Sequence, residues 1–248
     1  ASDHLIVSES LLRLGVLDEA TFEFKRAKRR LERCLEIRRA ASLSTDRLRP
    51  RILRWQGRVA MRMSDAQTAD RLSLESLEEF RRTGVTDGVD FAEGLLTRGE
   101  VLQFLGHYTQ ADLMLRESHR IMAQRLVEDH PRTARVLYAR AVIARTLGRN
   151  VESDNLYAKC LKSFQAMSSD HILVAWVFND LGNREFNARH FAEAEELGQK
   201  ALAIKIKVLG PDSIDVRITL NNLGNLYSQF GQREKAESYY GQALEIAV

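Results

Sequence analysis

The chain has 248 residues, 44% of them hydrophobic and 29% charged, so it is long enough to bury a substantial core. Its formal net charge of +3 does not by itself favour nucleic-acid binding. No apolar run approaches the roughly 20 residues that cross a bilayer, which argues against membrane insertion. Two cysteines in unrelated segments, Cys34 and Cys160, are typical of a reducing, cytoplasmic compartment.

Positive charge is concentrated near the N-terminus. Residues 25–58 carry 13 Lys or Arg against three acids, a net charge of +10 that leaves −7 for the rest of the chain. For the basic run at 25–39 the leading interpretation is the solvated face of an outer helix. Docking of this segment to an acidic protein, a membrane surface or a nucleic acid is the alternative.

Six units of about 42 residues follow one another along the chain, which we find by comparing the sequence with itself. One small residue marks each unit, with successive spacings of 49, 42, 42, 41 and 42 residues: Ala20, Ala69, Ala111, Ser153, Ala194 and Ala236. Positions seven residues later are also small: Ala27, Ser76, Ser118, Cys160, Ala201 and Ala243. So are positions twelve residues earlier: Ser8, Gly57, Gly99, Ala141, Gly182 and Gly224.

Each unit is predicted to be two antiparallel helices that cross closely at these small residues. The units cover residues 1–34, 50–82, 92–125, 134–166, 175–208 and 217–248, with turns marked by Gly15, Gly106, Gly148 and Gly231. A longer insert follows the first unit, whose second helix runs on to a break at 42–45. No polar cap closes the last unit at Val248, so we expect this chain to be part of a longer protein.

The pattern Leu-Gly, Tyr, Gly, Ala, Tyr and Ala within residues 223–243 resembles the tetratricopeptide repeat (TPR). The period and the spacers LGPDSIDV (209–216) and VEDHPRTA (127–134) resemble its kinesin-light-chain-like subclass. The resemblance implies an all-α, right-handed solenoid of six repeats whose concave groove binds a protein or peptide partner.

Motifs for catalysis are absent from the sequence. It has no glycine-rich phosphate loop, no HExxH and no paired-cysteine motif, and its six histidines are scattered without ligand spacing. We therefore expect neither enzymatic activity, nor a cofactor, nor a metal site.

In the resembled family the first helix of each pair forms the inner wall. The positions that this places in the groove are Arg51, Arg54, Arg58, Arg135, Tyr138, Arg145, Asn179, Asn183, Phe186, Asn221 and Asn225. Carboxamides can hold the backbone of an extended peptide, and guanidinium groups favour acidic side chains or a C-terminal carboxylate. The two aromatic residues would receive an apolar anchor, and Asn222 is expected to face a turn.

Several interpretations stay open at this point. The asparagines are also common in the subclass without a ligand, and the arginines could be solvated or paired with Glu100 or another inner acid. The leading hypothesis is a non-catalytic scaffold or adaptor that binds a short, extended, acidic peptide. The alternatives are a regulatory TPR domain of a larger enzyme or transcription regulator, a structural subunit of a cytoskeletal or ciliary assembly, and nucleic-acid binding through the basic segment. The oligomeric state does not follow from the sequence.

Overall fold

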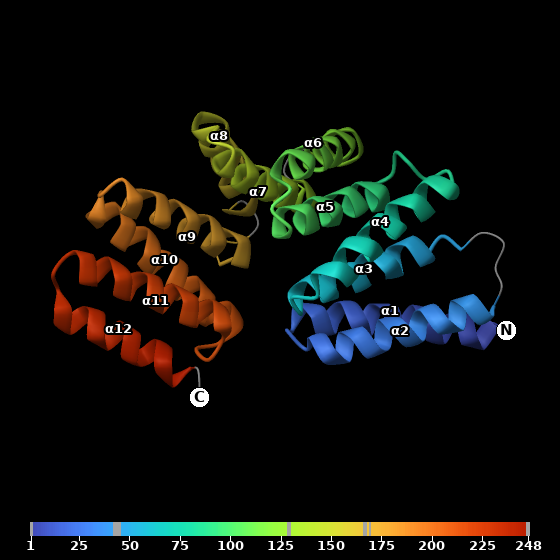
Figure 1. The fold of residues 1–248 in the computed structure, drawn as a ribbon, viewed down its shortest axis with the longest axis horizontal. Coiled ribbons are helices and arrows are strands. Elements are labelled where there is room, and N and C mark those ends of the chain that lie inside the picture. The colour runs from blue at the N-terminus through green and yellow to red at the C-terminus, as the bar shows by residue number, and fades with distance from the viewer. Residues whose placement is uncertain (1, 42–45, 128–129, 166–167, 169, 247–248) are drawn as a thin grey trace. The chain divides into compact units, whose positions relative to one another are not determined.

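The computed structural model describes residues 2–41, 46–127, 130–165, 168 and 170–246, and all regular secondary structure within them is helical (Figure 1). The twelve helices are α1 (Ser2–Ala20), α2 (Phe24–Ala40), α3 (Arg49–Arg62), α4 (Ala66–Arg82), α5 (Val89–Phe104), α6 (Tyr108–Arg125), α7 (Pro131–Thr146), α8 (Asn150–Gln165), α9 (Ile172–Asn187), α10 (Phe191–Leu209), α11 (Ile214–Gln229) and α12 (Arg233–Glu245). The predicted all-α fold is confirmed.

The helices form six successive pairs, and each pair is held together where its helices cross at a small residue. A Cβ atom on Gly99 would lie 2.7 Å from the Leu115 side chain, and one on Gly224 would lie 2.6 Å from the Tyr240 ring. In the fourth pair the crossing residue is Ala141, whose carbonyl accepts a hydrogen bond from Ser153 Oγ at 2.8 Å. We call this position of the first helix the crossing position.

The register predicted for the first pair is wrong by seven residues. Its crossing position is Gly15 rather than Ser8, because a Cβ on Gly15 would lie 2.9 Å from Leu31 and 3.6 Å from the Ala27 carbonyl. Gly15 is therefore inside α1 and does not mark a turn. The crossing positions are Gly15, Gly57, Gly99, Ala141, Gly182 and Gly224, so the first step is 42 residues and not 49.

The turns confirm this corrected register independently. Seven residues after every crossing position the backbone adopts a positive φ of 60–80°, at Phe22, Ser64, Gly106, Gly148, Arg189 and Gly231. Only three of the six are glycine, so glycine alone could not locate the turns. The first pair extends to Ala40, beyond the predicted end at 34, and the predicted break at 42–45 lies outside the described residues.

The chain divides into two compact units, which we describe separately. One comprises residues 1–128 and 139–154 and the other residues 129–138 and 155–248, so α7 contributes its two halves to different units. The first core contains Leu31, Cys34, Ile52 and Leu53, and the second centres on α10, α11 and α12.

Both cysteines are buried. Burial raises the pKa of the Cys34 thiol to about 11 and that of the Cys160 thiol to about 12, so both thiols are protonated and serve as packing residues.

Two helical glycines provide a matched test of the crossing. Gly99→Ala places a methyl group against Leu115 and should lower the free energy of unfolding by about 1–3 kcal/mol. Gly241→Ala in α12 meets no atom within 4 Å and should raise it by about 0.5–1 kcal/mol, because alanine is the better helix former. Urea unfolding of both variants measures the difference, and equal effects would show that the helices do not cross closely at residue 99.

Candidate functional site

A pocket of about 70 Å³ lies in the second unit between the first helices of the last two pairs. Its polar wall consists of Asn179 and Asn183 from α9 and Asn222 and Asn225 from α11, with Phe186 beside them. The three- and four-residue spacings place the asparagines of each helix on one face.

Small residues form part of the pocket floor. Gly182, Ala194 and Gly198 line it, and a Cβ atom on Gly198 would lie 2.8 Å from Leu223. The close approach of α10 to α11 at Gly198, and of α9 to α10 at Gly182, where a Cβ atom would lie 3.4 Å from the Ala194 carbonyl, therefore brings backbone to the pocket lining.

Hydrogen bonds fix part of the carboxamide cluster. Asn222 Nδ2 donates to Asn179 Oδ1 at 3.3 Å, and the Tyr240 hydroxyl donates to Asn225 Oδ1 at 2.7 Å. The Asn183 carboxamide has no hydrogen-bond partner within the described part of the chain. Donors on Asn179, Asn183 and Asn225 and an acceptor on Asn183 thus remain for a ligand.

Asn222, which was expected to face a turn, lines the pocket, and Asn221 does not. Asn221 is three residues before the crossing position, and the same position in the two preceding pairs holds Tyr138 and Asn179. Both of those residues bond to the next first helix, Tyr138 to Asp180 and Asn179 to Asn222. This position therefore points along the array to the next pair, and Asn221 is exposed.

Tyr138 is held by packing and hydrogen bonding within the second unit. Its hydroxyl donates to Asp180 Oδ2 at 3.0 Å, an atom that also accepts from the Tyr157 hydroxyl at 3.0 Å. Its ring lies 6.0 Å from that of Trp176. The structure therefore gives Tyr138 a role in joining α7 to α9, whereas Phe186 borders the pocket.

Lys205 of α10 lies behind the pocket and was not singled out from the sequence. It is 2% exposed, and its ammonium donates to the Thr219 hydroxyl at 2.7 Å and the Asp215 carbonyl at 3.5 Å. Thr219 in turn lines the pocket. Burial lowers the pKa of Lys205, and the charges of Asp215 and Asp180 oppose that shift.

The sequence does contain a signal for Lys205. The small residue of the second helix that faces each crossing position lies twelve residues after it. Eleven residues further on, where the fifth pair has Lys205, three other pairs carry Phe80, Met122 and Phe164. The first pair carries Arg38 at this position, so Lys205 and Arg38 are two buried cations in a column that is apolar in the other three pairs, and a cation there indicates a buried charge.

Two of the predicted groove arginines are neutralised by acids of the first unit. Arg54 Nη1 donates to Glu93 Oε2 at 2.6 Å, and Arg58 Nε donates to Glu19 Oε1 at 2.8 Å. Glu100 lies 3.7 Å from Arg58, and burial raises the pKa of its carboxyl group. The interpretation that the arginines pair with Glu100 or another inner acid therefore describes Arg54 and Arg58.

The other predicted groove arginines are Arg51, Arg135 and Arg145. Arg51 lies 3.6 Å from Asp90, with 40% of its side chain exposed. Arg135 and Arg145 are half-buried on α7 and both have interaction partners.

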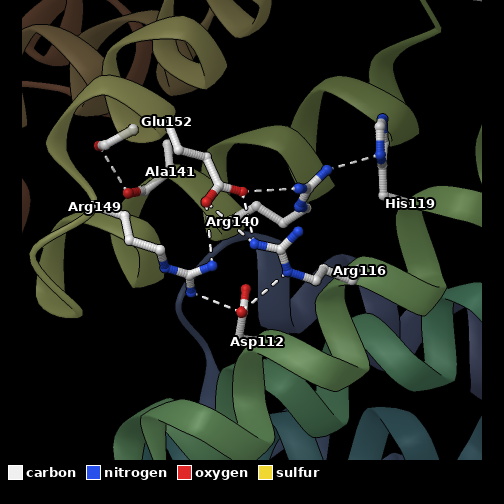
Figure 2. A network of polar contacts seen from close by, with 8 residues as sticks. Asp112, Arg116, His119, Arg140, Ala141, Arg149 and Glu152 are labelled. Atoms are coloured by element: carbon white, nitrogen blue, oxygen red, sulfur yellow. Dashed lines mark hydrogen bonds and ion pairs between the residues drawn. The ribbon is translucent and has the colours of Figure 1, made fainter.

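A polar network in the first unit joins α6 to α7 and α8 (Figure 2). Arg116 and Arg149 both donate to Asp112 Oδ2, at 3.0 and 2.6 Å, and both also contact Glu152. Arg140 donates to Glu152 at 3.1 Å and contacts His119 Nδ1 at 2.8 Å, which requires that nitrogen to be the acceptor. Three guanidinium groups share two carboxylates, an arrangement suited to fixing helices.

The basic N-terminal segment lies largely on α2, the outer helix of the first pair. Arg26 and Arg30 pair with Asp18 at 2.8 and 2.7 Å, whereas Lys25 and Arg29 are exposed. A cavity of about 530 Å³ lies between α2, α3 and α4, bordered by cations and acids in equal number: Lys28, Arg39, Arg71, Glu32, Glu36 and Asp65. A partner of one charge is therefore not favoured there.

Within the described ranges, no three His, Cys, Asp or Glu side chains are grouped as metal ligands. No helix of the described residues is long and apolar enough to span a bilayer.

Three stretches of the chain, residues 90–166, 132–207 and 173–247, match the family model of the tetratricopeptide repeat. Together they cover more than half of the chain, which therefore belongs to the TPR family. No curated protein sequence matches.

Solved structures with the same fold include BtubC (BKLC) from P. vanneervenii, at 20% identity over 99% of this chain and 89% of that chain, with a TM-score of 0.64. A putative kinesin light chain repeat protein of Podospora anserina matches at 20% identity over 80% and 95%, with a TM-score of 0.59. A Rap protein complexed with competence and sporulation factor matches at 15% identity over 100% and 65%, with a TM-score of 0.70. These likenesses confirm a TPR solenoid fold with repeats of the kinesin-light-chain type.

Arg58 and Arg51 on α3 differ in burial and allow a paired test of the ion network. Arg58→Ala leaves Glu19 with only the more distant Arg62, at 3.6 Å, and removes the close cation of Glu100, so it should lower the free energy of unfolding by about 3 kcal/mol. Arg51→Ala removes an exposed, long contact and should cost less than about 1 kcal/mol. Chemical denaturation at pH 7 checks both, and equal losses would contradict a buried network centred on Arg58.

Lys205→Met should stabilise the protein at pH 7 by at least about 1 kcal/mol, because a buried cation is replaced by an apolar chain of similar length. The folded-state pKa of Lys205 is lowered below the usual 10.5, so the unfolded state binds more protons between the two values. Wild-type stability therefore rises through this window relative to the variant, and the advantage of Lys205→Met should shrink towards pH 10.5. Unfolding measured from pH 7 to 10.5 tests this, and a constant difference would contradict it.

Proposed function

We propose that this chain is a non-catalytic protein-interaction scaffold that binds a short, extended peptide segment at the carboxamide pocket. The observation that carries the proposal is the convergence of four asparagine side chains from α9 and α11 on one pocket, with the Asn183 carboxamide unbonded in the described part of the protein. An unbonded carboxamide at a pocket wall is ready to exchange hydrogen bonds with a ligand.

The chemistry of the cluster suits a peptide backbone. A carboxamide presents a donor and an acceptor, as a peptide group does, so successive asparagines can bond N–H and C=O groups whatever the side chains of the ligand. Phe186 offers an apolar contact at the edge of the pocket. Because ordering a flexible peptide costs a few kcal/mol, we expect affinity of roughly micromolar strength.

We further propose that the preferred segment carries acidic residues and that the protein acts in the cytoplasm. Arg51, with a long and exposed contact to Asp90, is the predicted arginine best able to exchange its partner for a ligand carboxylate. Arg54 and Arg58 contribute less to binding an acidic ligand, because they already form ion pairs with Glu93 and Glu19. Two buried, protonated thiols accord with a reducing compartment. A neighbour of the same fold, the Rap protein, was solved in complex with a competence and sporulation factor.

A peptide-display library screened against the chain tests the pocket. Asn183→Ala combined with Asn225→Ala should reduce the binding of selected peptides at least tenfold, because the peptide backbone loses its hydrogen bonds to both carboxamides. Asn221→Ala is the matched control, since Asn221 lies on the same helix but outside the pocket, and it should leave binding unchanged. Identical peptide selection by all three proteins would show that the pocket is not the binding site.

A further inference from the structure

Lys205 differs from the other buried cation of its column in having no carboxylate in contact. Arg38, at the equivalent position of the first pair, forms an ion pair with Asp46 at 2.6 Å. The Lys205 ammonium donates only to two neutral oxygens, and the carboxylates of Asp215 and Asp180 act on it from a distance. A buried charge is normally paired, because removing it from water is costly. Lys205 is 2% exposed and therefore carries a buried charge without a direct counter-ion among the described residues.

This charge lies directly behind the carboxamide pocket. Lys205 Nζ is 2.7 Å from the hydroxyl oxygen of Thr219, and Thr219 lines the pocket. The hydroxyl donates its own hydrogen to the Asp215 carbonyl at 3.0 Å, an oxygen to which Lys205 also donates at 3.5 Å. Because the ammonium can hold this carbonyl alone, the Thr219 hydroxyl can rotate and donate to a group in the pocket. Thr219 thus connects the buried charge to the pocket.

The pocket lining is rich in hydrogen-bond donors and has no charged side chain among the described residues. Asn179 Oδ1 and Asn225 Oδ1 already accept hydrogen bonds, so these two residues present N–H donors to a ligand. Pockets for whole small molecules measure about 300–1,000 Å³, whereas this pocket measures about 70 Å³ and suits a single functional group. The group that fits best offers oxygen atoms and negative charge.

We propose that Lys205 is a specificity-determining residue of the carboxamide pocket, whose buried charge makes the pocket select a peptide carboxylate over a neutral amide of the same shape. The proposal rests on the proposed function, because it names the group of the bound peptide that enters the pocket. The carboxylate supplies the counter-charge that Lys205 lacks, and the asparagine N–H groups and the Thr219 hydroxyl bond its oxygens. An acidic side chain and a free C-terminus offer the same chemistry.

Salt separates this effect from that of an exposed cation. The Lys205 ammonium is shielded from solvent, so added salt screens its attraction for a carboxylate only weakly. Arg51, with 40% of its side chain exposed, would lose its attraction as the ionic strength rises.

Matched peptides test the selection by isothermal titration calorimetry. The probe is the tightest peptide from the display library, presented with free C-termini, whose binding depends on Asn183 and Asn225. It is compared with versions in which each Asp or Glu becomes Asn or Gln, and with one whose C-terminus is amidated. For the wild type, neutralising one carboxylate should weaken binding at least about tenfold, at low and at high salt. The version that loses affinity identifies the source, a side chain or the C-terminus.

Lys205→Met should reduce this penalty to less than about threefold, because an apolar side chain no longer favours a carboxylate over an amide. Its affinity for the neutralised peptide should match that of the wild type, which shows that the pocket is intact. Lys207→Met is the matched control. Lys207 lies two residues further along α10, pairs with Asp170 and has 68% of its side chain exposed, so this variant should keep the full penalty.

An equal penalty in Lys205→Met and the wild type would overturn the proposal, and so would a pocket-bound peptide that tolerates neutralisation of every carboxylate. Weaker binding of the neutralised peptide by Lys205→Met would also overturn it, since it would show a structural role alone. A penalty lost at high salt would assign the selection to an exposed cation instead. In all these cases binding still depends on Asn183 and Asn225, so the proposed function stands. If no selected peptide depends on the two asparagines, the proposed function fails and this proposal fails with it.

Discussion

The close crossing of two helices at one small side chain is the constraint on which the rest of the molecule depends. At Gly99 and Gly224 a single methyl group would lie within 2.7 Å of the facing side chain, so the crossing fixes the positions along the two helix axes at which the helices meet. This in turn sets where the chain must turn, and a positive φ follows seven residues after the crossing position in every pair. Repetition of this unit every 41 or 42 residues places equivalent side chains in columns, and the pocket and the ion network both lie on such columns.

The sequence alone predicted the all-α repeat fold and the register of the last five pairs, but it misplaced the first. Seven residues are nearly two helical turns, so a slip from Gly15 to Ser8 keeps the same face of α1 towards α2. Small residues occupy both registers there, since Ala20 and Ala27 each fit the search. The position of the turn would have distinguished the two registers. However, the residue with positive φ in this turn is Phe22, a residue type that does not indicate a positive φ, so the sequence does not mark the turn.

Of the residues that line the candidate pocket, the sequence singled out Asn179, Asn183, Phe186 and Asn225, but it did not give their individual contacts. A helical face includes residues three and four apart, and the sequence placed Asn221 in the groove and Asn222 towards a turn, whereas in the structure Asn222 is the residue that meets Asn179. Whether an arginine is available depends on residues about 40 positions away, as with Arg54 and Glu93. Periodicity gives the column of a side chain, but its partner depends on the helix packed against it.

The same columns carry different polar chemistry in the two units, and this difference is the reason we propose the second unit as the binding site. Arg54, with its carboxylate partner Glu93, is already desolvated and bonded, so a ligand would have to break a buried ion pair to reach it. Asn183, which is neutral and unbonded in the described residues, costs far less to desolvate and can donate and accept. Charge in the first unit therefore serves mainly to hold its helices together, while the neutral amides of the second unit keep donors and acceptors that are unbonded within the described residues.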